Sequence, residues 1–315
     1  MTNSHRVVTL ALALVLVAPA TPARAQAAES HYDHLVRLAN SYQVTLDVTY
    51  RTANNWDATL DIIRPRQTST PTPTVLFFHG GGWTGGSKDA GLLAALPYAE
   101  MGYAVVNVAY RLAGVSLAPA AVEDARCALR WVYRNAKQYN FDLNRLVLTG
   151  QSAGGHLALV AGMLTEEAGL DLGCPGDRGA GPFNTDPLKV AAIVNWYGIT
   201  DVREMLGGPN RRAYAVMWLG GQPSREQIAT QVSPLTHVRP GLPPVLTIHG
   251  DADPTVPYTQ AQRLHEALQK AGVTSQLVTV PKGGHGGFAV DETLRIHAAI
   301  RSFLTRHVGA VTSSN

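Results

Sequence analysis

Residues 150–155 read Gly-Gln-Ser-Ala-Gly-Gly, and they lie directly between an apolar run, Leu146–Leu148, and a helix-favouring run, His156–Leu159. A strand that passes through a tight turn into a helix holds the turn residue in a strained backbone conformation and lifts its side chain above the sheet. Small flanking residues keep neighbouring atoms from clashing in such a turn. Ser152 is therefore the candidate nucleophile, and the chain must contain a strand–turn–helix unit at this point.

A second glycine-rich loop, His79–Trp83 (His-Gly-Gly-Gly-Trp), follows the apolar run Val75–Phe78. Glycines let the backbone present N–H groups where a side chain would intrude, and acyl transfer needs such donors for the charge that develops on a carbonyl oxygen. We expect Gly81, Gly82 and the N–H of Ala153 to form this oxyanion hole, with His79 as a brace. The loop has neither the Gly-x-Gly-x-x-Gly spacing nor the lysine of a phosphate-binding loop.

The third motif is His249–Pro257, His-Gly-Asp-Ala-Asp-Pro-Thr-Val-Pro, at the end of another apolar run. A histidine base needs a carboxylate that fixes its tautomer and stabilises the imidazolium. Two aspartates compete for this role. We favour Asp253, which lies further into the loop, whereas Asp251 is close enough to the strand end to brace the turn.

The base itself is expected at His285, in the glycine-rich stretch Gly283–Phe288 after the last strand. A histidine in such a loop reaches over the edge of a sheet. The order along the chain, Ser152, Asp253, His285, is one of the known orders of a Ser–His–Asp triad.

Strand and helix patterns alternate along the rest of the chain. Strands are expected at 44–48, 58–63, 75–78, 103–108, 145–149, 190–196, 245–249 and 277–280, and helices at 119–138, 153–164, 259–271 and 292–307. Fully apolar strands joined by helices predict an α/β fold, a mainly parallel sheet covered on both faces. We expect one catalytic domain over 26–315, with insertions at about 166–188 and 202–235 that act as a cap or form a pocket.

Composition excludes several other classes of protein. The 26 basic and 23 acidic residues give a net charge of +3, too small to indicate a nucleic-acid-binding protein. A 45% hydrophobic content excludes a mostly disordered chain. Two cysteines cannot form a disulfide-rich scaffold or a four-cysteine zinc site. The proposed chemistry requires no metal and no organic cofactor.

Residues 1–25 have the three parts of a secretory signal peptide. A basic start precedes the apolar run Val7–Ala18, and Ala23–Ala25 is a small-x-small cleavage pattern. The apolar run is shorter than the ~20 residues that span a bilayer, so we expect no stable membrane insertion. Cleavage near Ala25 predicts a secreted or periplasmic protein. In an oxidising compartment Cys127 and Cys174 could pair, and two free buried thiols are the alternative.

Taken together, the four motifs resemble those of α/β-hydrolase carboxylesterases, and most closely the branch of bacterial feruloyl and acetylxylan esterases. The likeness runs from about Val44 to about Leu304. It implies that the second aspartate of the third motif, Asp253, is the triad acid. Gln151 stands where the hormone-sensitive-lipase branch typically has aspartate, which favours the feruloyl and acetylxylan side.

The resemblance implies hydrolysis of a small-molecule or polysaccharide-borne ester, such as an acetyl or feruloyl ester of plant polysaccharide. The alternatives are a generic short-chain esterase or lipase, and an arylformamidase or peptidase-type amide hydrolase on the same fold. Five aromatic residues are candidates for the substrate pocket, although each is equally compatible with an ordinary core position: Trp83, Trp196, Tyr197, Tyr214 and Trp218.

Overall fold

The computed structural model describes residues 31–66, 68–175 and 188–311. The chain divides into two units, Met1–Ala39 and Asn40–Asn315. The predicted signal peptide, residues 1–25, lies outside the described residues, as does part of the first predicted insertion. Among the described residues no helix has both the length and the apolar character needed to cross a membrane.

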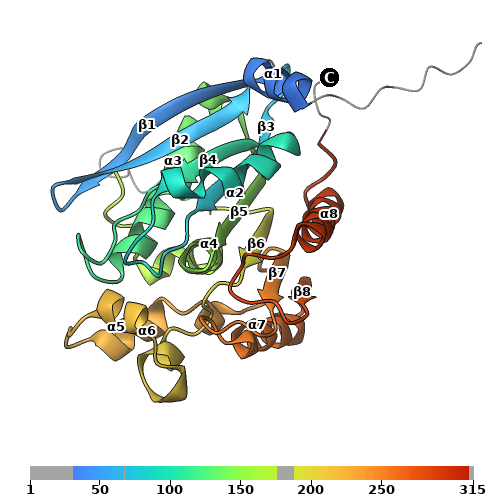
Figure 1. Ribbon diagram of the computed structural model, residues 1–315. Helices are drawn as coiled ribbons and strands as arrows, with labels where there is room; N and C mark the ends of the chain where they lie inside the picture. The colour runs from blue at the N-terminus through green and yellow to red at the C-terminus, as the bar shows by residue number, and fades with distance from the viewer. Residues whose placement is uncertain (1–30, 67, 176–187, 312–315) are drawn as a thin grey trace, which may run out of the picture. The chain divides into compact units, whose positions relative to one another are not determined.

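The second unit is built on one eight-stranded sheet with the strand order β1-β2-β4-β3-β5-β6-β7-β8 (Figure 1). The two opening strands pair antiparallel, and β2 also runs antiparallel to β4. The other neighbouring strands are parallel. The strands are β1 (Tyr42–Ala53), β2 (Trp56–Pro65), β3 (Thr72–Phe78), β4 (Ala104–Val108), β5 (Phe141–Gln151), β6 (Ala192–Trp196), β7 (Val245–Gly250) and β8 (Ser275–Val280).

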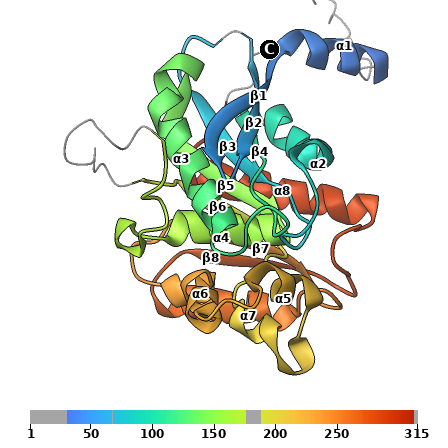
Figure 2. The same cartoon turned by 90° about the vertical axis from the view of Figure 1, so that its left-hand side faces the viewer.

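Helices cover both faces of this sheet, which explains why β3, β4, β6 and β7 are buried along their whole length (Figure 2). On β3, Leu76 and Phe78 join one buried cluster and Val75 and Phe77 join the other, because successive side chains of a strand point to opposite faces. The first cluster contains residues of α3 (Ala120–Tyr139), α4 (Ala153–Met163) and α7 (Tyr258–Lys270), and the second those of α2 (Lys88–Glu100) and α8 (Val290–His307). The predicted α/β class with a mainly parallel sheet is therefore confirmed.

Helix α2 lies where the sequence pattern predicts no helix. It contains Gly91 and Pro97, two residues that disfavour a helix interior. The side chain of Ser87 nevertheless caps its start by accepting a hydrogen bond from the N–H of Ala90 at 3.2 Å. Burial of small and aromatic side chains against the sheet outweighs the low propensity.

Shorter elements occupy the regions outside the sheet. Helix α1 (His31–Ser41) precedes β1. The predicted insertion at 202–235 contains α5 (Ala213–Leu219), α6 (Arg225–Gln231) and the 3₁₀ turns Arg203–Leu206, Gly208–Asn210 and Pro234–His237. The described start of the first insertion contains the 3₁₀ turn Glu166–Ala168.

A disulfide joins Cys127 on α3 to Cys174 in the first insertion. An ion pair supports the same connection, because the buried carboxylate of Asp171 accepts a hydrogen bond from Arg126 at 2.7 Å and another from Arg130 at 3.0 Å. Of the two alternatives for the cysteines, the structure has the covalent pair. The start of this insertion is thereby fixed to α3.

We expect the double variant Cys127→Ala/Cys174→Ala to unfold more easily than the wild type. The disulfide links residues 47 positions apart, and removing a cross-link of this span lowers the free energy of unfolding by about 2–4 kcal/mol. Urea unfolding measures the difference. Dithiothreitol should lower the midpoint of the wild type and leave that of the double variant unchanged; a wild type insensitive to reduction contradicts the prediction.

Candidate active site

Ser152 occupies the turn between β5 and α4, and its backbone has the strained conformation that the motif predicts. Its φ is +56° and its ψ is −118°, and its N–H donates to the carbonyl of Trp196 at 2.9 Å. The turn requires close backbone packing, because a Cβ on Gly154 would lie 2.0 Å from the carbonyl oxygen of Phe78. Only glycine allows α4 to begin this near the end of β3.

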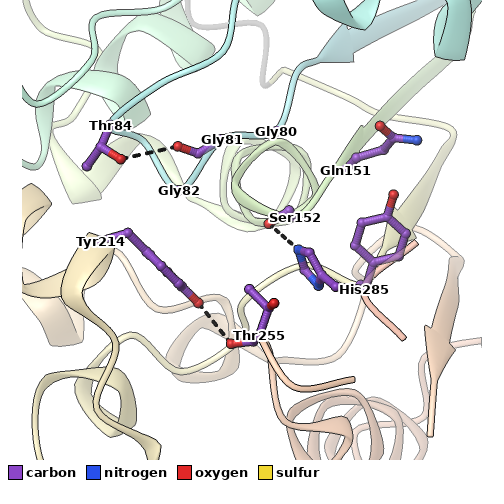
Figure 3. Close-up of a pocket in the computed structure, with 10 residues that line it drawn as sticks. Gly80, Gly81, Gly82, Thr84, Gln151, Ser152, Tyr214, Thr255 and His285 are labelled. Atoms are coloured by element: carbon purple, nitrogen blue, oxygen red, sulfur yellow. Dashed lines mark hydrogen bonds between the residues drawn. The ribbon is translucent and has the colours of Figure 1, made fainter. Parts of the chain in front are cut away.

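The structure brings together three side chains that are far apart in the sequence. Nε2 of His285 lies 2.8 Å from Oγ of Ser152 (Figure 3). Nδ1 of the same ring lies 2.7 Å from Oδ2 of Asp253. With the hydrogen on Nδ1 donated to the carboxylate, Nε2 is free to accept the hydroxyl hydrogen of the serine. This arrangement is able to transfer a proton from Ser152 to His285.

Hydrogen-bond donors at both carboxylate oxygens keep Asp253 in its charged form. Its Oδ1 accepts hydrogen bonds from the N–H groups of Thr255 at 2.7 Å and Val256 at 2.9 Å, while Oδ2 faces His285 and His249. Burial by itself would raise the pKa of Asp253, but these hydrogen bonds outweigh burial and hold the pKa well below its usual range. The carboxylate is therefore charged and fixed at neutral pH.

The competing aspartate has a different position. Asp251 is exposed, and its Oδ1 accepts a hydrogen bond from the N–H of Lys282 at 2.6 Å. This contact braces the turn between β7 and the loop of His285. Of the two aspartates in the third motif, Asp253 is the one that contacts His285.

The glycine loop lies above Ser152 and is folded back on itself. The carbonyl of Gly81 accepts hydrogen bonds from the N–H groups of Thr84 at 3.1 Å and Gly85 at 3.0 Å. Gly82 has a φ of +59°, and a Cβ there would lie 2.9 Å from the side chain of Tyr214. Ala153 is the first residue of α4, where an N–H has no acceptor within the helix. The N–H groups of Gly81, Gly82 and Ala153 remain our candidates for the oxyanion hole.

His79 contacts the base of this loop and lies away from the triad. Its Nδ1 is 2.7 Å from the carbonyl of Gly80, and its ring stacks on Tyr110 with the ring centroids 4.3 Å apart. Tyr110 in turn donates its hydroxyl hydrogen to the carbonyl of His79 at 2.9 Å. Burial lowers the pKa of His79. These contacts fit the bracing role predicted for His79.

For the three candidate tryptophans, the structure has the second alternative, an ordinary core position, and none of them lines the pocket. Trp83 and Trp218 are fully buried and stacked on each other, with centroids 4.1 Å apart. Trp196 is also buried, and its Nε1 donates to the hydroxyl of Tyr98 at 3.1 Å. Trp83 has a φ of +58°, and its ring belongs to the buried cluster that also contains residues of α3 and α4. Trp83 and Trp218 contribute their apolar area to one buried cluster, and Trp196 contributes its area to the other.

Tyr197 and Tyr214 do line the pocket, which has a volume of about 480 Å³. The ring of Tyr197 packs against His285, with centroids 4.7 Å apart. Tyr214 donates its hydroxyl hydrogen to the carbonyl of Thr255 at 3.2 Å. Figure 3 shows Tyr214 and Gln151 on opposite sides of Ser152. The lining residues are Gly80, Gly81, Gly82, Thr84, Gln151, Ser152, Tyr197, Tyr214, Thr255 and His285.

Four of these lining residues were not predicted from the sequence to line the pocket: Gly80, Thr84, Gln151 and Thr255. Each of the four lies within one of the sequence motifs or one residue beyond it. Closeness to a motif could therefore have identified them as lining residues. No group of three or more His, Cys, Asp or Glu side chains in the described part of the chain is placed to hold a metal ion.

Comparison with known proteins agrees with this geometry. The model of the BD-FAE family matches residues 60–268, about two thirds of the chain, and the chain belongs to this family. Esterase LipC of Mycobacterium tuberculosis is 29% identical over 236 residues, covering 72% of this chain and 56% of LipC. Isoprenylcysteine alpha-carbonyl methylesterase ICME of Arabidopsis thaliana is 28% identical over 248 residues, covering 75% of this chain and 55% of that protein. The chain thus spans little more than half the length of these curated relatives.

Two solved structures match this chain over nearly the whole of their own length. A truncated form of a carbohydrate esterase from gut microbiota has a TM-score of 0.69 and 27% identity, over 85% of this chain and 98% of that one. Esterase 2 of Thermogutta terrifontis, phosphonylated by sarin, has a TM-score of 0.71 and 27% identity, over 86% of this chain and 97% of that one. The expected likeness to α/β-hydrolase carboxylesterases is confirmed, and the fold is the α/β-hydrolase fold.

We expect a fluorophosphonate probe to label Ser152 and to fail on Ser152→Ala. Asp253→Asn should slow labelling on the order of 10³–10⁴-fold, because the base loses the acceptor that fixes its tautomer. Asp251→Asn is the matched control and should label within about threefold of the wild type, since Asp251 contacts only the turn. Intact-mass spectrometry over time measures the rates; equal slowing by the two asparagine variants contradicts the assignment.

A second prediction concerns His156, which supports the site from below by accepting a hydrogen bond from Nε1 of Trp83 at 3.2 Å. Burial lowers the pKa of His156 to about 3, against about 6.5 in an unfolded chain. Between these values the unfolded state binds a proton that the folded state does not. The free energy of unfolding should therefore fall as the pH drops, with about 1.4 kcal/mol per pH unit due to this group.

The variant His156→Gln cannot take up that proton. Urea unfolding at several pH values between 6 and 4 should show a shallower decline for the variant than for the wild type, by about 1.4 kcal/mol per pH unit. Parallel curves for the two proteins would show that another group causes the decline.

Proposed function

We propose that this protein is a serine carboxylesterase that cleaves its substrate through an acyl-enzyme intermediate. The observation that carries the proposal is the continuous hydrogen-bonded chain from Ser152 through His285 to Asp253, directly beneath the glycine loop. The esterases among its relatives and structural neighbours support the same reaction class.

Acylation begins when Oγ of Ser152 attacks the carbonyl carbon of the ester. Nε2 of His285 takes the hydroxyl hydrogen, and Asp253 stabilises the imidazolium that forms. The ester carbonyl oxygen gains negative charge, and the N–H groups of Gly81, Gly82 and Ala153 are the donors that meet this charge. When the tetrahedral intermediate collapses, His285 returns the proton to the departing alcohol.

Deacylation repeats these steps with water as the nucleophile. His285 takes a proton from the water as it attacks the acyl carbon, the oxyanion is held by the same N–H groups, and Ser152 leaves with the proton that His285 returns. The products are a carboxylic acid and an alcohol, and the enzyme regains its starting state.

For the substrate class we propose acetyl or feruloyl esters carried on plant polysaccharide. The described part of the pocket wall contains three glycines, two threonines and two tyrosines but no Leu, Ile, Val, Met or Phe. Such a wall gives a long aliphatic chain little apolar surface, while it accommodates a small acyl group or an aromatic ring. The carbohydrate esterase among the structural neighbours supports this class.

We also propose that the protein acts outside the cytoplasm, in the periplasm or the medium. The signal-peptide pattern of residues 1–25 supports export. The disulfide between Cys127 and Cys174 is of the kind that persists in oxidising compartments.

We expect kcat/KM for p-nitrophenyl esters to show no increase from acetate to octanoate. An apolar pocket would contribute about 0.8 kcal/mol for each buried CH₂ group, and the described wall offers no aliphatic side chain for this contact. Release of acetate from acetylated xylan and of ferulate from methyl ferulate tests the acyl group directly, with Ser152→Ala as the control. A steady rise with chain length would indicate a lipase, and cleavage of aryl formamides in preference to every ester would indicate an amide hydrolase.

A further inference from the structure

We propose that His249 is a positioning residue for the triad: a second histidine that donates to the carboxylate of Asp253 and fixes the oxygen to which His285 binds. The proposal rests on the proposed function, because Asp253 matters to the reaction only if Ser152 and His285 carry it. His249 itself lies at the end of β7, four residues before Asp253, and does not line the substrate pocket.

The contacts of His249 converge on the acid loop. Its Nε2 lies 3.2 Å from Oδ2 of Asp253 and 3.0 Å from the carbonyl oxygen of Val256. The side chains of His249 and Asp253 are both fully buried, so solvent does not weaken this contact. The rings of His249 and Tyr258 also pack in a T-shaped arrangement, with centroids 5.7 Å apart.

These neighbours decide which nitrogen of His249 carries the hydrogen. A carboxylate oxygen and a carbonyl oxygen are both acceptors, so Nε2 must be the donor. Nδ1 is buried and has no hydrogen-bond partner among the described residues, which fits a nitrogen without hydrogen. His249 therefore presents one N–H, shared between the two oxygens.

The N–H of His249 matters because it faces Oδ2 of Asp253. The same oxygen accepts the hydrogen bond from Nδ1 of His285. The backbone N–H groups of Thr255 and Val256 hold only Oδ1. Without His249, the carboxylate would be free to rotate about the Oδ1 contacts, and Oδ2 would lose one of its two donors. Catalysis needs the acceptor of His285 held close to its productive place, since small misplacements at such sites lower rates strongly.

A buried histidine that only packs the core is the competing explanation, and the two explanations differ in measurable ways. A packing role predicts lower stability with kcat of the folded enzyme unchanged. A positioning role predicts a lower kcat in folded enzyme and recovery by any side chain that restores the donor.

The test compares His249→Phe with His249→Gln in the full-length protein. Phenylalanine keeps the ring and removes the donor, and we expect kcat to fall about 10- to 100-fold with KM within about threefold of the wild type. Glutamine places an amide N–H near the position of Nε2, and we expect recovery of kcat to within about fivefold of the wild type. Equal kcat values for the two variants, or a phenylalanine variant as active as the wild type, would overturn the proposal.

Thr247→Val is the matched control for a general disturbance of β7. Thr247 is buried on the same strand, two residues before His249, and accepts a hydrogen bond from Asn195 without contacting the triad. We expect this variant to lose stability while it keeps the kcat of the wild type. A loss of kcat as large as that of His249→Phe would assign the effect to the strand.

A second readout keeps the proposal testable if His249→Phe fails to fold or the wild type cleaves no ester. In ¹⁵N-labelled wild-type protein, NMR distinguishes the two neutral tautomers of each histidine, and the signals of His249 are those absent from His249→Gln. We expect the hydrogen on Nε2. A hydrogen on Nδ1 would overturn the contact with Asp253, whereas an inactive wild type with the hydrogen on Nε2 would overturn only the proposed function.

Discussion

The site depends on a packing constraint at the junction of β3, β5 and α4. The backbone of α4 begins so near the end of β3 that no side chain fits at Gly154. This close approach sets Ser152 in its strained turn and brings the turn beneath the glycine loop, where a Cβ on Gly80 would lie 3.1 Å from the carbonyl oxygen of Gln151. A nucleophile next to fixed backbone N–H groups is therefore a consequence of how two strands and one helix meet.

The acid side of the site is held from two directions. From the sheet, His249 at the end of β7 contacts Asp253. From the insertion at 202–235, Arg212 and Tyr214 both donate to the carbonyl of Thr255, whose N–H donates to Asp253. The insertion thus forms a wall of the pocket and at the same time supports the loop that carries the acid.

The floor of the site is made of aromatic side chains. Trp83 and Trp218 stack on each other, and His156 lies at their edges and links Trp83 to the carbonyl of Val232 in the insertion. Because Trp83 is the last residue of the glycine-rich loop, this packing fixes the loop from below. Rigid support of this kind lets backbone donors act without reorganising during the reaction.

The sequence by itself determined the strand–turn–helix at Ser152, the buried strands of the sheet and the two glycine-rich loops, because each of these features depends on residues that are neighbours in the chain. It missed α2, whose low helix propensity is offset by burial against the sheet. Only the tertiary structure decided that Asp253 contacts His285, that Cys127 pairs with Cys174, and that the tryptophans pack the core. The physical reason is that these contacts depend on the order of strands in the sheet and on single backbone turns, which bring together or separate side chains regardless of their spacing in the sequence.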